Sequence, residues 1–583
     1  MQNPPHRGGA GWRACGPSAR SADYHRHPLT DPTPIDPIAR LREAVGAAVA
    51  AVGDGAAARS EPTLERPPKA ELGDYSTNAA MLLAPTLGAP PREVAGRLRD
   101  ALSGELGADA ERTEVAGPGF LNLFLASTWY RRVTSEILAA GERFGASVAA
   151  PPERVLVEFV SANPTGPLTV ASGRGAAYGD ALARSLELAG HQIEREYLLN
   201  DVGGQVRRFA ASIAARMEGR QPPEDGYGGD YVTELARELA AEGLGPEDVD
   251  RLARAGTEAM RERIAASLER FGVRFDTWFS ERSVHETGKV AAVVEALRER
   301  GHVYESEGAT WLRTTSFGDD KDRVLVRAGG EPTYFAADVA YHRDKLERGW
   351  ERLIDPLGAD HHGYVPRMRA AIEALGADPA TYEAPILQLV HLVEGGERAR
   401  MSKRRGEFVS LDELVGDIGV DAARFLMLQR SHDTTVDLDL DLARRQSQDN
   451  PVYYVQYAHA RIASILRKAV ADGAAPDDPG AIAEGAGSEA ALAAEAEPAE
   501  RALMRRLLEL PSEVRVAAER RAPHRLCAYA TATAADFHAF YRDCRVVGAA
   551  PEVEAARLGL CVAAKRIIAT TLGVLGVAAP ERM

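Results

Sequence analysis

The fold is decided around Val155-Leu156-Val157-Glu158-Phe159-Val160, which is followed directly by Ser161 to Arg174, reading SANPTGPLTVASGR. The first run is short, apolar and β-branched, which is typical of a buried parallel strand. Two prolines and a glycine within 163–167 prevent either a strand or a helix from continuing. From Gly173 to Ala189 apolar residues recur at helical spacing. The order strand, irregular loop, helix predicts the first unit of a parallel α/β sheet.

Three further runs, Arg323–Arg327, Leu353–Leu357 and Ile386–Leu392, have the length and composition of strands, and helical patterns lie between them. This alternation favours a doubly wound parallel sheet. We expect ligands beyond the carboxyl ends of its strands, where such sheets bind them.

The remaining chain divides by composition. Residues 1–33 are rich in Pro, Gly, Arg and His without an apolar period, so we expect a disordered tail or an over-extended start. A small α/β domain is predicted at 34–127. Residues 205–300 are charged and helical in pattern, which indicates an inserted connecting segment.

From Asn450 onward the pattern is almost wholly helical. Residues 471–500 contain eight acids and no Lys or Arg, which predicts a flexible acidic loop or a poorly ordered helix. Residues 501–583 carry a net charge of +5. A basic terminal region on an acidic chain suggests contact with a polyanion, although an ordinary solvated surface explains it equally well.

The whole chain of 583 residues has 70 Lys or Arg and 85 Asp or Glu, a formal net charge of −15. This balance excludes a uniformly basic nucleic-acid binder but not a basic face on an acidic protein. Uninterrupted apolar stretches such as 47–52 are far shorter than the roughly 18 residues of a membrane span, and no secretory signal is evident. The four cysteines lack CxxC spacing, which disfavours a cysteine zinc site and fits a reducing cytoplasm.

The first candidate site is the loop after the decisive strand. A loop between a parallel strand and a helix N-terminus can bind phosphate, and Thr169 and Ser172 would offer hydroxyl donors there. A plain N-capping turn is the alternative. No GxxxxGK[ST] motif occurs, and Gly173-x-Gly175-x-x-x-Gly179 is not a dinucleotide fingerprint because its third glycine comes one residue late.

The second candidate is the glycine-flanked loop Gly395–Gly406, which follows an apolar strand and holds five cations between Arg398 and Arg405. A mobile basic loop can close on a polyphosphate and neutralise developing charge. A solvated surface loop is the alternative, and the position after a strand of the sheet favours function.

Two more candidates follow. Tyr334, Asp338 and Tyr341 share one helical face, so an acid between two phenols could bind a cationic side chain, or could merely be structural. Residues 357–364 read LGADHHGY at a predicted strand end, where a ribose or α-ammonium contact is more plausible than zinc. No metal site is predicted.

In this order, Asn163-Pro-Thr-Gly-Pro-Leu168, Tyr334-x-x-x-Asp338, Gly358-Ala-Asp-His-His-Gly363 and Met401-Ser-Lys-Arg404 resemble the class I arginyl-tRNA synthetases of bacterial type. Further stretches fit the same family: FGDDKDRV at 317–324, DAARF at 421–425, DNPVYYVQYAHAR at 449–461 and APERM at 579–583. The resemblance covers about residues 36–583.

The resemblance implies an α/β plus all-α protein. Residues 34–127 would be a tRNA-contacting N-terminal domain and 128–436 a Rossmann-type catalytic domain with the insertion at about 205–300. Residues 437–583 would be a helical-bundle anticodon-binding domain. The implied reaction is activation of L-arginine by ATP with Mg²⁺ and transfer to the terminal ribose of tRNA(Arg). A cytoplasmic monomer without a membrane or a tightly bound cofactor is expected.

The family also implies roles for single residues. Asn163 would hold the α-amino group of arginine, and Tyr334 and Asp338 its guanidinium, because a carboxylate matches the planar fork of donors. Asp360 or His361 would contact the amino-acid head group or ATP, and the choice stays open. The implied catalytic residues are Thr169, Ser172, Arg400 and Lys403. The implied ATP-binding residues are Pro167, Thr169, Ala171, Ser172, Gly358, Asp360, Met401, Ser402 and Lys403.

One departure from the family is in its first ATP signature, usually His-x-Gly-His, which reads Thr169-Val-Ala-Ser172 here. Losing one transition-state donor typically costs about 2.7–4 kcal/mol in activation free energy, and the two hydroxyls can replace part of that. The leading hypothesis is an active synthetase. The alternatives are a non-catalytic relative that binds tRNA or arginine, and a small-molecule adenylyltransferase of the same fold.

Overall fold

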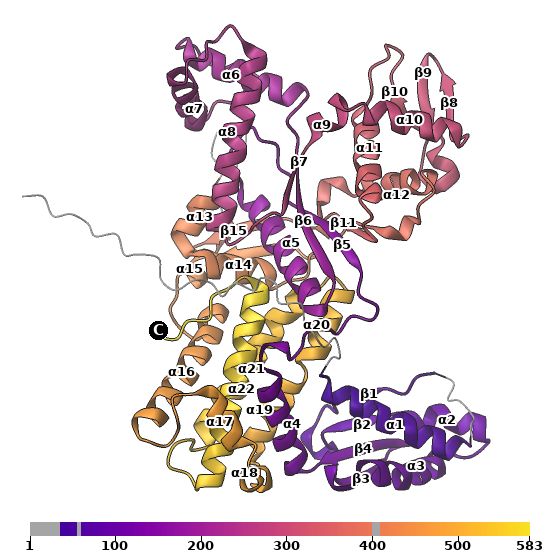
Figure 1. Ribbon diagram of the computed structural model, residues 1–583, viewed down its shortest axis with the longest axis vertical. Coiled ribbons are helices and arrows are strands. Elements are labelled where there is room, and N and C mark those ends of the chain that lie inside the picture. Colours follow the sequence, from indigo (N-terminus) through magenta and orange to yellow (C-terminus); the bar gives the residue numbers. More distant parts are fainter. Residues whose placement is uncertain (1–34, 55–59, 399–408) are drawn as a thin grey trace, which may run out of the picture. The chain divides into compact units, whose positions relative to one another are not determined.

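The computed structural model describes residues 35–54, 60–398 and 409–583 (Figure 1). The predicted tail at 1–33 lies outside these ranges.

A five-stranded parallel sheet forms the centre of the catalytic part (Figure 1). Its strands are β5 (Arg154–Glu158), β6 (Gln192–Leu199), β7 (Thr277–Ser280), β11 (Arg352–Ile354) and β13 (Tyr382–Glu383). They lie in the order β13-β11-β5-β6-β7, and every neighbouring pair is parallel. The chain therefore builds outward from β5 in both directions, which confirms the predicted doubly wound sheet and opens a crevice at the carboxyl end of β5.

Helix α5 (Val170–Ala189) follows β5 as predicted and covers the sheet. Its apolar face, including Ala176, Leu182 and Leu186, is fully buried. Gly179 lets the helix approach the strand, because a Cβ there would overlap the ring of Phe159. This close contact fixes where the helix begins relative to the strand end.

The other strand predictions need correction. Arg323–Arg327 is a strand, β10 (Arg323–Val326), but it belongs to an antiparallel sheet with β9 (Ala309–Leu312) and β8 (Val303–Ser306). A short apolar run does not reveal the direction of its partner, so the sequence could not separate this sheet from the parallel one.

Strands β6 and β7 were missed, and the predicted run 386–392 divides. It contains β14 (Ile386–Leu387) and the start of β15 (Val390–Glu394), and β15 pairs in parallel with β17 (Val436–Asp439) in a separate sheet. The charged residues of β6 hide its strand character, because their partners come from distant segments.

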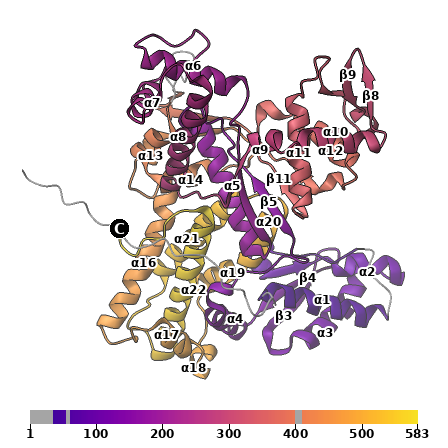
Figure 2. The ribbon, with the colours of Figure 1, turned by 45° about the horizontal axis from the view of Figure 1, so that its top comes forward.

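The predicted insertion at 205–300 is interrupted by β7. Before it come α6 (Gly204–Met217), α7 (Asp230–Ala241) and α8 (Val249–Arg270), which share a core of their own (Figure 2). After it come α9 (Glu281–Glu286) and α10 (Lys289–Glu299), and then the antiparallel sheet leads into α11 (Tyr334–Glu347).

The remaining elements of the catalytic part are short and follow β11 in the sequence. They are β12 (Leu357–Gly358), α12 (Tyr364–Ala374), β16 (Glu397–Arg398), α13 (Leu411–Ile418), α14 (Val420–Leu428) and α15 (Leu440–Ala443).

The N-terminal part is a small α/β unit with a sheet in the order β1-β2-β4-β3, antiparallel throughout. Its elements are α1 (Pro37–Gly53), β1 (Leu64–Glu65), β2 (Tyr75–Thr77), α2 (Ala79–Leu87), α3 (Pro91–Leu106), β3 (Ala110–Ala116) and β4 (Phe120–Leu125). Helix α4 (Ser127–Ala140) then leads to the catalytic part.

The C-terminal part is helical. Its helices are α16 (Pro451–Ala471), α17 (Pro479–Ala486), α18 (Glu489–Ala493), α19 (Pro498–Leu508), α20 (Leu510–Glu519), α21 (His524–Asp543) and α22 (Pro551–Leu575). Within the predicted acidic loop, α17 and α18 both pack against α22 and α4 and bury Ile482, Ala486 and Ala491. The prediction of a flexible loop was therefore wrong, because small apolar residues between the acids supply a buried face.

Helix α22 is the one described helix that is long and apolar enough to suit a membrane span, and 78% of its most apolar window is buried inside the protein. It is the central helix of the bundle. Arg557, Lys565 and Arg566 interrupt its apolar residues, so a search for uninterrupted runs does not find it. Burial also raises the pKa of the Cys561 thiol on this helix to about 12.

A buried ion pair within the catalytic part lies where that part meets the bundle. Arg424 of α14 is fully buried and contacts Asp180 of α5 at 2.5 Å. Its guanidinium also donates to the carbonyls of Phe271 at 3.1 Å and Leu575 at 3.0 Å. Burial opposes the charge of Asp180, but the neighbouring arginines hold its pKa below the usual value.

Asp180→Asn should lower the free energy of unfolding by about 3–5 kcal/mol, because it leaves the buried guanidinium without a carboxylate. Denaturant unfolding followed by fluorescence measures this. The matched control is Glu187→Gln on the same helix, whose pair with Arg195 is half-exposed and whose removal should cost less than about 1 kcal/mol. Equal shifts in the two variants would contradict the assignment.

Candidate active site

The carboxyl edge of the parallel sheet gathers the predicted residues Asn163 and Gly358 together with two acids that were not predicted. Asn163 follows β5, Asp201 follows β6, Glu281 follows β7, and Gly358 lies shortly after β11. Since parallel strands end at one edge, these segments surround the crevice beside β5.

Thr169 is the N-cap of α5. Its Oγ1 accepts a hydrogen bond from the Ser172 backbone amide at 3.4 Å and lies 3.3 Å from the Ser172 Oγ. The two hydroxyls are therefore side by side at the positive end of a twenty-residue helix, where an anion is stabilised. The capping interpretation is confirmed at this position, and the phosphate interpretation stays a prediction. Pro167 precedes this turn and Ala171 lies exposed within it.

The family's second ATP signature corresponds to Met401-Ser-Lys-Arg404 here, and of the loop 395–410 that holds it only the two ends are described. Arg400, Met401, Ser402 and Lys403 lie outside the described residues. Just beyond them, Ser410 forms a β-bridge with Thr169, and the amide of Leu411 donates to the Leu168 carbonyl at 2.8 Å. The end of this segment is thus attached to the first signature.

Asn163 is exposed at the crevice, and its Nδ2 donates to Oε1 of Gln205 at 2.9 Å. Gln205 lies in the first turn of α6. The sequence did not single it out, and no pattern in the sequence marks it.

Two acids, Glu281 of α9 and Asp338 of α11, lie close together where these helices meet and form what we call the acidic pocket. Burial raises the pKa of Asp338 to about 6, although a hydrogen bond from Tyr364 opposes this. Burial, followed by the negative charges of Asp338 and Asp201, raises the pKa of Glu281 to about 7. Two neighbouring acids in this state favour a bound cation, which would relieve their mutual repulsion.

The carboxylate of Asp201 has hydrogen-bond partners from neighbouring residues. Its carboxylate accepts from Ser280 Oγ at 2.6 Å and from the Arg282 amide at 2.9 Å. The Arg282 guanidinium lies 3.6 Å away. Asp338 and Glu281 are therefore the acids of this pocket with raised pKa values.

The two tyrosines differ in position from the prediction. Tyr334, the first residue of α11, is 64% exposed, and its hydroxyl approaches Gly203. Tyr341 is buried and donates to Glu196 at 2.5 Å. The expectation of an acid between two phenols was wrong for Tyr341, because that ring lies one turn further into the core.

Gly358 ends β12, and Asp360 and His361 lie in the short turn that follows; all three residues are exposed. The imidazole of His361 lies 3.6 Å from the Asp360 carboxylate. Downstream, Tyr364 connects this segment to Asp338. In residues 35–54, 60–398 and 409–583, no three His, Cys, Asp or Glu side chains form a group that could hold a metal ion.

Comparison with known proteins agrees with this geometry. The arginyl-tRNA synthetase N-terminal domain matches residues 39–125, the class I (R) tRNA synthetase catalytic domain matches 245–461, and the DALR anticodon-binding domain matches 455–583. The arginine–tRNA ligase of Kineococcus radiotolerans is 45% identical over 94% of this chain and 100% of its own length. That of Carboxydothermus hydrogenoformans is 44% identical over 89% and 94%.

The chain belongs to the arginyl-tRNA synthetase family. Among solved structures, the Thermus thermophilus arginyl-tRNA synthetase matches with a TM-score of 0.73 and 25% identity over 93% of this chain and all of its own. The resemblance stated from the sequence motifs is confirmed, as is the fold class.

Sequence reasoning missed Glu281 of this synthetase. The residue directly follows β7, and Thr277-Trp-Phe-Ser280 has the aromatic, β-prone composition of a strand. Recognising that strand would have placed Glu281 at the ligand-binding edge of the sheet.

Arginine binding should strengthen as the pH rises from 5.5 to 8. The carboxyls of Glu281 and Asp338 have raised pKa values in the ligand-free protein, and the guanidinium of arginine stays charged throughout this range. Binding therefore favours the ionised carboxylates and releases protons. We expect the Kd to fall by about 10- to 100-fold over this range, measured by isothermal titration. Glu281→Gln should remove the step near pH 7. A Kd that is constant within twofold in the unmodified protein would contradict the role of the pocket.

Proposed function

We propose that this synthetase converts L-arginine and ATP·Mg²⁺ to arginyl-adenylate and pyrophosphate, and then transfers the arginyl group to the terminal ribose of tRNA(Arg). The observation that carries the proposal is the paired, partly neutralised carboxyls of Glu281 and Asp338 at the ligand-binding edge of the sheet. We place this activity in the cytoplasm and in a monomer.

Specificity for arginine would come from that acidic pocket. A guanidinium presents five N–H donors in a planar fork, which match carboxylate oxygens. An uncharged amino acid of similar shape would leave two acids buried without a partner and would be rejected for that reason. Tyr334 would cover the guanidinium from the solvent side, and the Asn163 side-chain oxygen would accept a hydrogen bond from the α-ammonium group. Asp360 or His361 would contact the head group or ATP.

In the first step, a carboxylate oxygen of arginine attacks the α-phosphorus of ATP, and pyrophosphate leaves. Negative charge grows on the phosphate oxygens, so donors aimed at them lower the barrier. Thr169 and Ser172 would supply neutral donors at the start of α5. Arg400 and Lys403 would supply charge at the β- and γ-phosphates. Pro167, Ala171, Gly358, Met401 and Ser402 would complete the ATP site.

Contact with tRNA is supported by an aromatic cluster on the helical C-terminal part. The Arg461 guanidinium lies 5.0 Å from the ring centres of both Tyr457 and Tyr541. Tyr541 is 40% exposed. Tyr457 is half-buried, and partly exposed aromatic rings with an arginine beside them suit the stacking of unpaired bases. We propose that residues 437–583 bind the anticodon and that 34–127 contact tRNA elsewhere, with 128–436 as the catalytic domain.

A non-catalytic relative is the second candidate. The observation that favours it is the replacement of both imidazoles of the first signature by Thr169 and Ser172, whose hydroxyls already contact one another. Such a protein would keep the acidic pocket and bind arginine without activating it.

Charging of bulk bacterial tRNA, with each of the twenty amino acids in turn, separates the two candidates. We expect arginine alone to be attached, because only its side chain matches the acidic pair. Pyrophosphate exchange with arginine, assayed with and without tRNA, checks the first step separately. Arginine binding without charging would establish the non-catalytic candidate instead.

Ser172→Ala should lower kcat for pyrophosphate exchange by about 10²-fold, since it removes a donor to the developing phosphate charge. The arginine KM should stay within about twofold, because Ser172 does not contact the acidic pocket. Ser185→Ala is the matched control: it lies on the same helix, where its hydroxyl donates to the Ala181 carbonyl at 2.7 Å. An unchanged kcat in Ser172→Ala would assign phosphate stabilisation to the other groups.

A further inference from the structure

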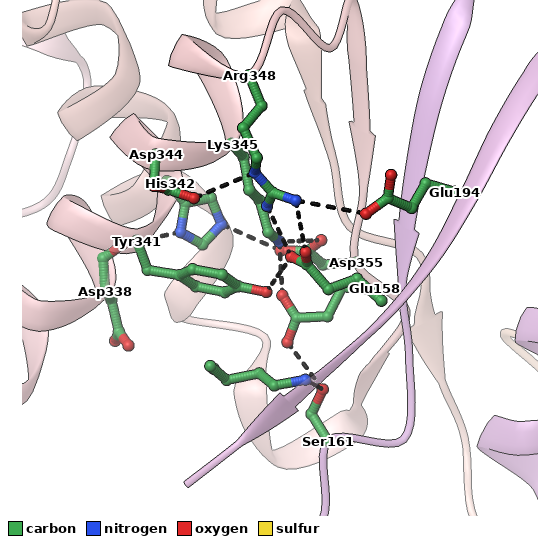
Figure 3. A network of polar contacts seen from close by, with 12 residues as sticks. Glu158, Ser161, Glu194, Asp338, Tyr341, His342, Asp344, Lys345, Arg348 and Asp355 are labelled. Carbon is green, nitrogen blue, oxygen red and sulfur yellow. Dashed lines mark hydrogen bonds and ion pairs between the residues drawn. The ribbon is translucent and has the colours of Figure 1, made fainter. Parts of the chain in front are cut away.

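Lys345 is a buried cation without a role in the functions proposed above. It lies in the last turns of α11, and its side chain is 0% exposed. Its Nζ lies 2.5 Å from Glu158 Oε2 and 3.1 Å from Asp355 Oδ1 (Figure 3). The ammonium therefore joins the ends of the neighbouring strands β5 and β11 to the helix that carries Asp338.

The same cluster includes the imidazole of His342. One ring nitrogen, Nε2, lies 3.0 Å from Asp355 Oδ2, and the other lies 2.9 Å from the carbonyl of Asp338. Asp355 thus has two basic partners, whereas Lys345 is the ammonium that Glu158 contacts. Buried ion pairs of this kind often add little stability compared with an apolar core, but removing one partner is costly because the other charge is left buried and unpaired.

The backbone directly after Glu158 is strained. Val160 has φ 68° and Ser161 has φ 39°, both in the left-handed region. For a β-branched residue such as Val160 this conformation is a genuine outlier. The Ser161 amide donates to the Phe159 carbonyl at 3.0 Å, which closes a tight turn around Val160. Strain of this kind persists only where the surroundings hold it.

Glu158 is one of the groups that hold this turn. Ser161 Oγ donates to Glu158 Oε1 at 2.9 Å and accepts from the Leu198 amide at 3.1 Å. The Tyr197 hydroxyl donates to the Ala162 carbonyl at 2.8 Å. Lys345 binds one oxygen of Glu158 and Ser161 binds the other, so the carboxylate cannot rotate without losing one of these partners.

We propose that Lys345 is a positioning residue that acts through Glu158. It fixes the carboxylate that holds the strained turn 159–162, and this turn presents Asn163 to the α-ammonium of arginine. Because Lys345 is on the same helix as Asp338, the ammonium also sets the separation between the two ends of the arginine site. The role in arginine binding rests on the proposed function, but the control of the turn does not.

The effect should be selective for arginine. ATP would be bound at Thr169 and beyond, after Pro164 and Pro167 have redirected the chain, where the start of α5 is also held by the β-bridge between Thr169 and Ser410. A displaced turn should therefore weaken arginine binding much more than ATP binding.

The experiment compares Lys345→Met with the unmodified protein by two readouts. Hydrogen exchange of peptides covering 159–168 in the ligand-free protein reports the turn, and isothermal titration with arginine reports binding. We expect faster exchange at 159–168 and at least a tenfold higher Kd for arginine, with the ATP KM within twofold. Lys289→Met is the matched control. Lys289 of α10 pairs with Asp344, which is next to Lys345 on α11, and this pair does not include Glu158.

Glu158→Gln, alone and combined with Lys345→Met, tests the route of action. If Lys345 acts through Glu158, the double variant loses no more arginine affinity than Glu158→Gln alone. Lys345→Met leaves the buried Glu158 carboxylate without its ammonium and could fail to fold for that reason. The double variant has no charge at position 158, so it tests the role of Lys345 in that case.

Two outcomes would overturn the proposal: unchanged exchange and arginine affinity in Lys345→Met, or losses that multiply in the double variant. If the unmodified protein binds no arginine, the proposed function is overturned, while exchange at 159–168 still decides whether Lys345 controls the turn.

Discussion

A single buried ammonium, that of Lys345, holds together the strands from which the sheet is built outward. Burial alone would lower its pKa, but the charges of Asp355 and Glu158 raise it, so the group stays charged. Taking three charges out of water costs several kcal/mol per ion, and only close contacts on both sides of the ammonium offset this cost. These contacts fix the end of β5 relative to the end of β11. The charges of Glu158 and Asp355 are balanced by Lys345, whereas Asp338 and Glu281 remain available to bind a cationic ligand.

How far the sequence predicts this arrangement depends on where each residue finds its partner. The strand β5 and helix α5 were predicted because an apolar run, a proline-glycine loop and a helical period follow one another locally. Glu194 and Glu196 give β6 a polar pattern because Arg348, more than 150 residues later, supplies their partner at 3.4 Å and 2.7 Å. Glu281 was missed for a related reason: its position becomes significant only once β7 is known to be the edge of the parallel sheet.

Composition was also a poor guide to the C-terminal charge. Many cations of 501–583 contact acids within the protein and are not free to attract a polyanion. Such pairs are Arg505 with Asp74 at 3.2 Å, Arg515 with Asp36 at 3.1 Å, Arg521 with Glu383 at 2.8 Å and Arg557 with Glu500 at 3.0 Å. The first three of these arginines join the helical part to the N-terminal and catalytic parts, and Arg557 pairs within the helical part. The exposed stack around Arg461 is therefore a better indication of nucleic-acid contact than the net charge of +5.

The hydroxyls of the first signature differ from imidazoles in one decisive respect. A hydroxyl can accept one hydrogen bond and donate another, so Thr169 can cap α5 with its oxygen and still donate its proton to a phosphate. It brings no positive charge, however, whereas a protonated imidazole does. The charge that opposes the developing phosphate charge must then come from the α5 N-terminus, equivalent to roughly half an elementary charge, and from the cations of 398–405. On the proposed function, the substitution would shift the electrostatic part of catalysis towards the second signature, and Thr169 and Ser172 would keep the task of orienting the phosphate.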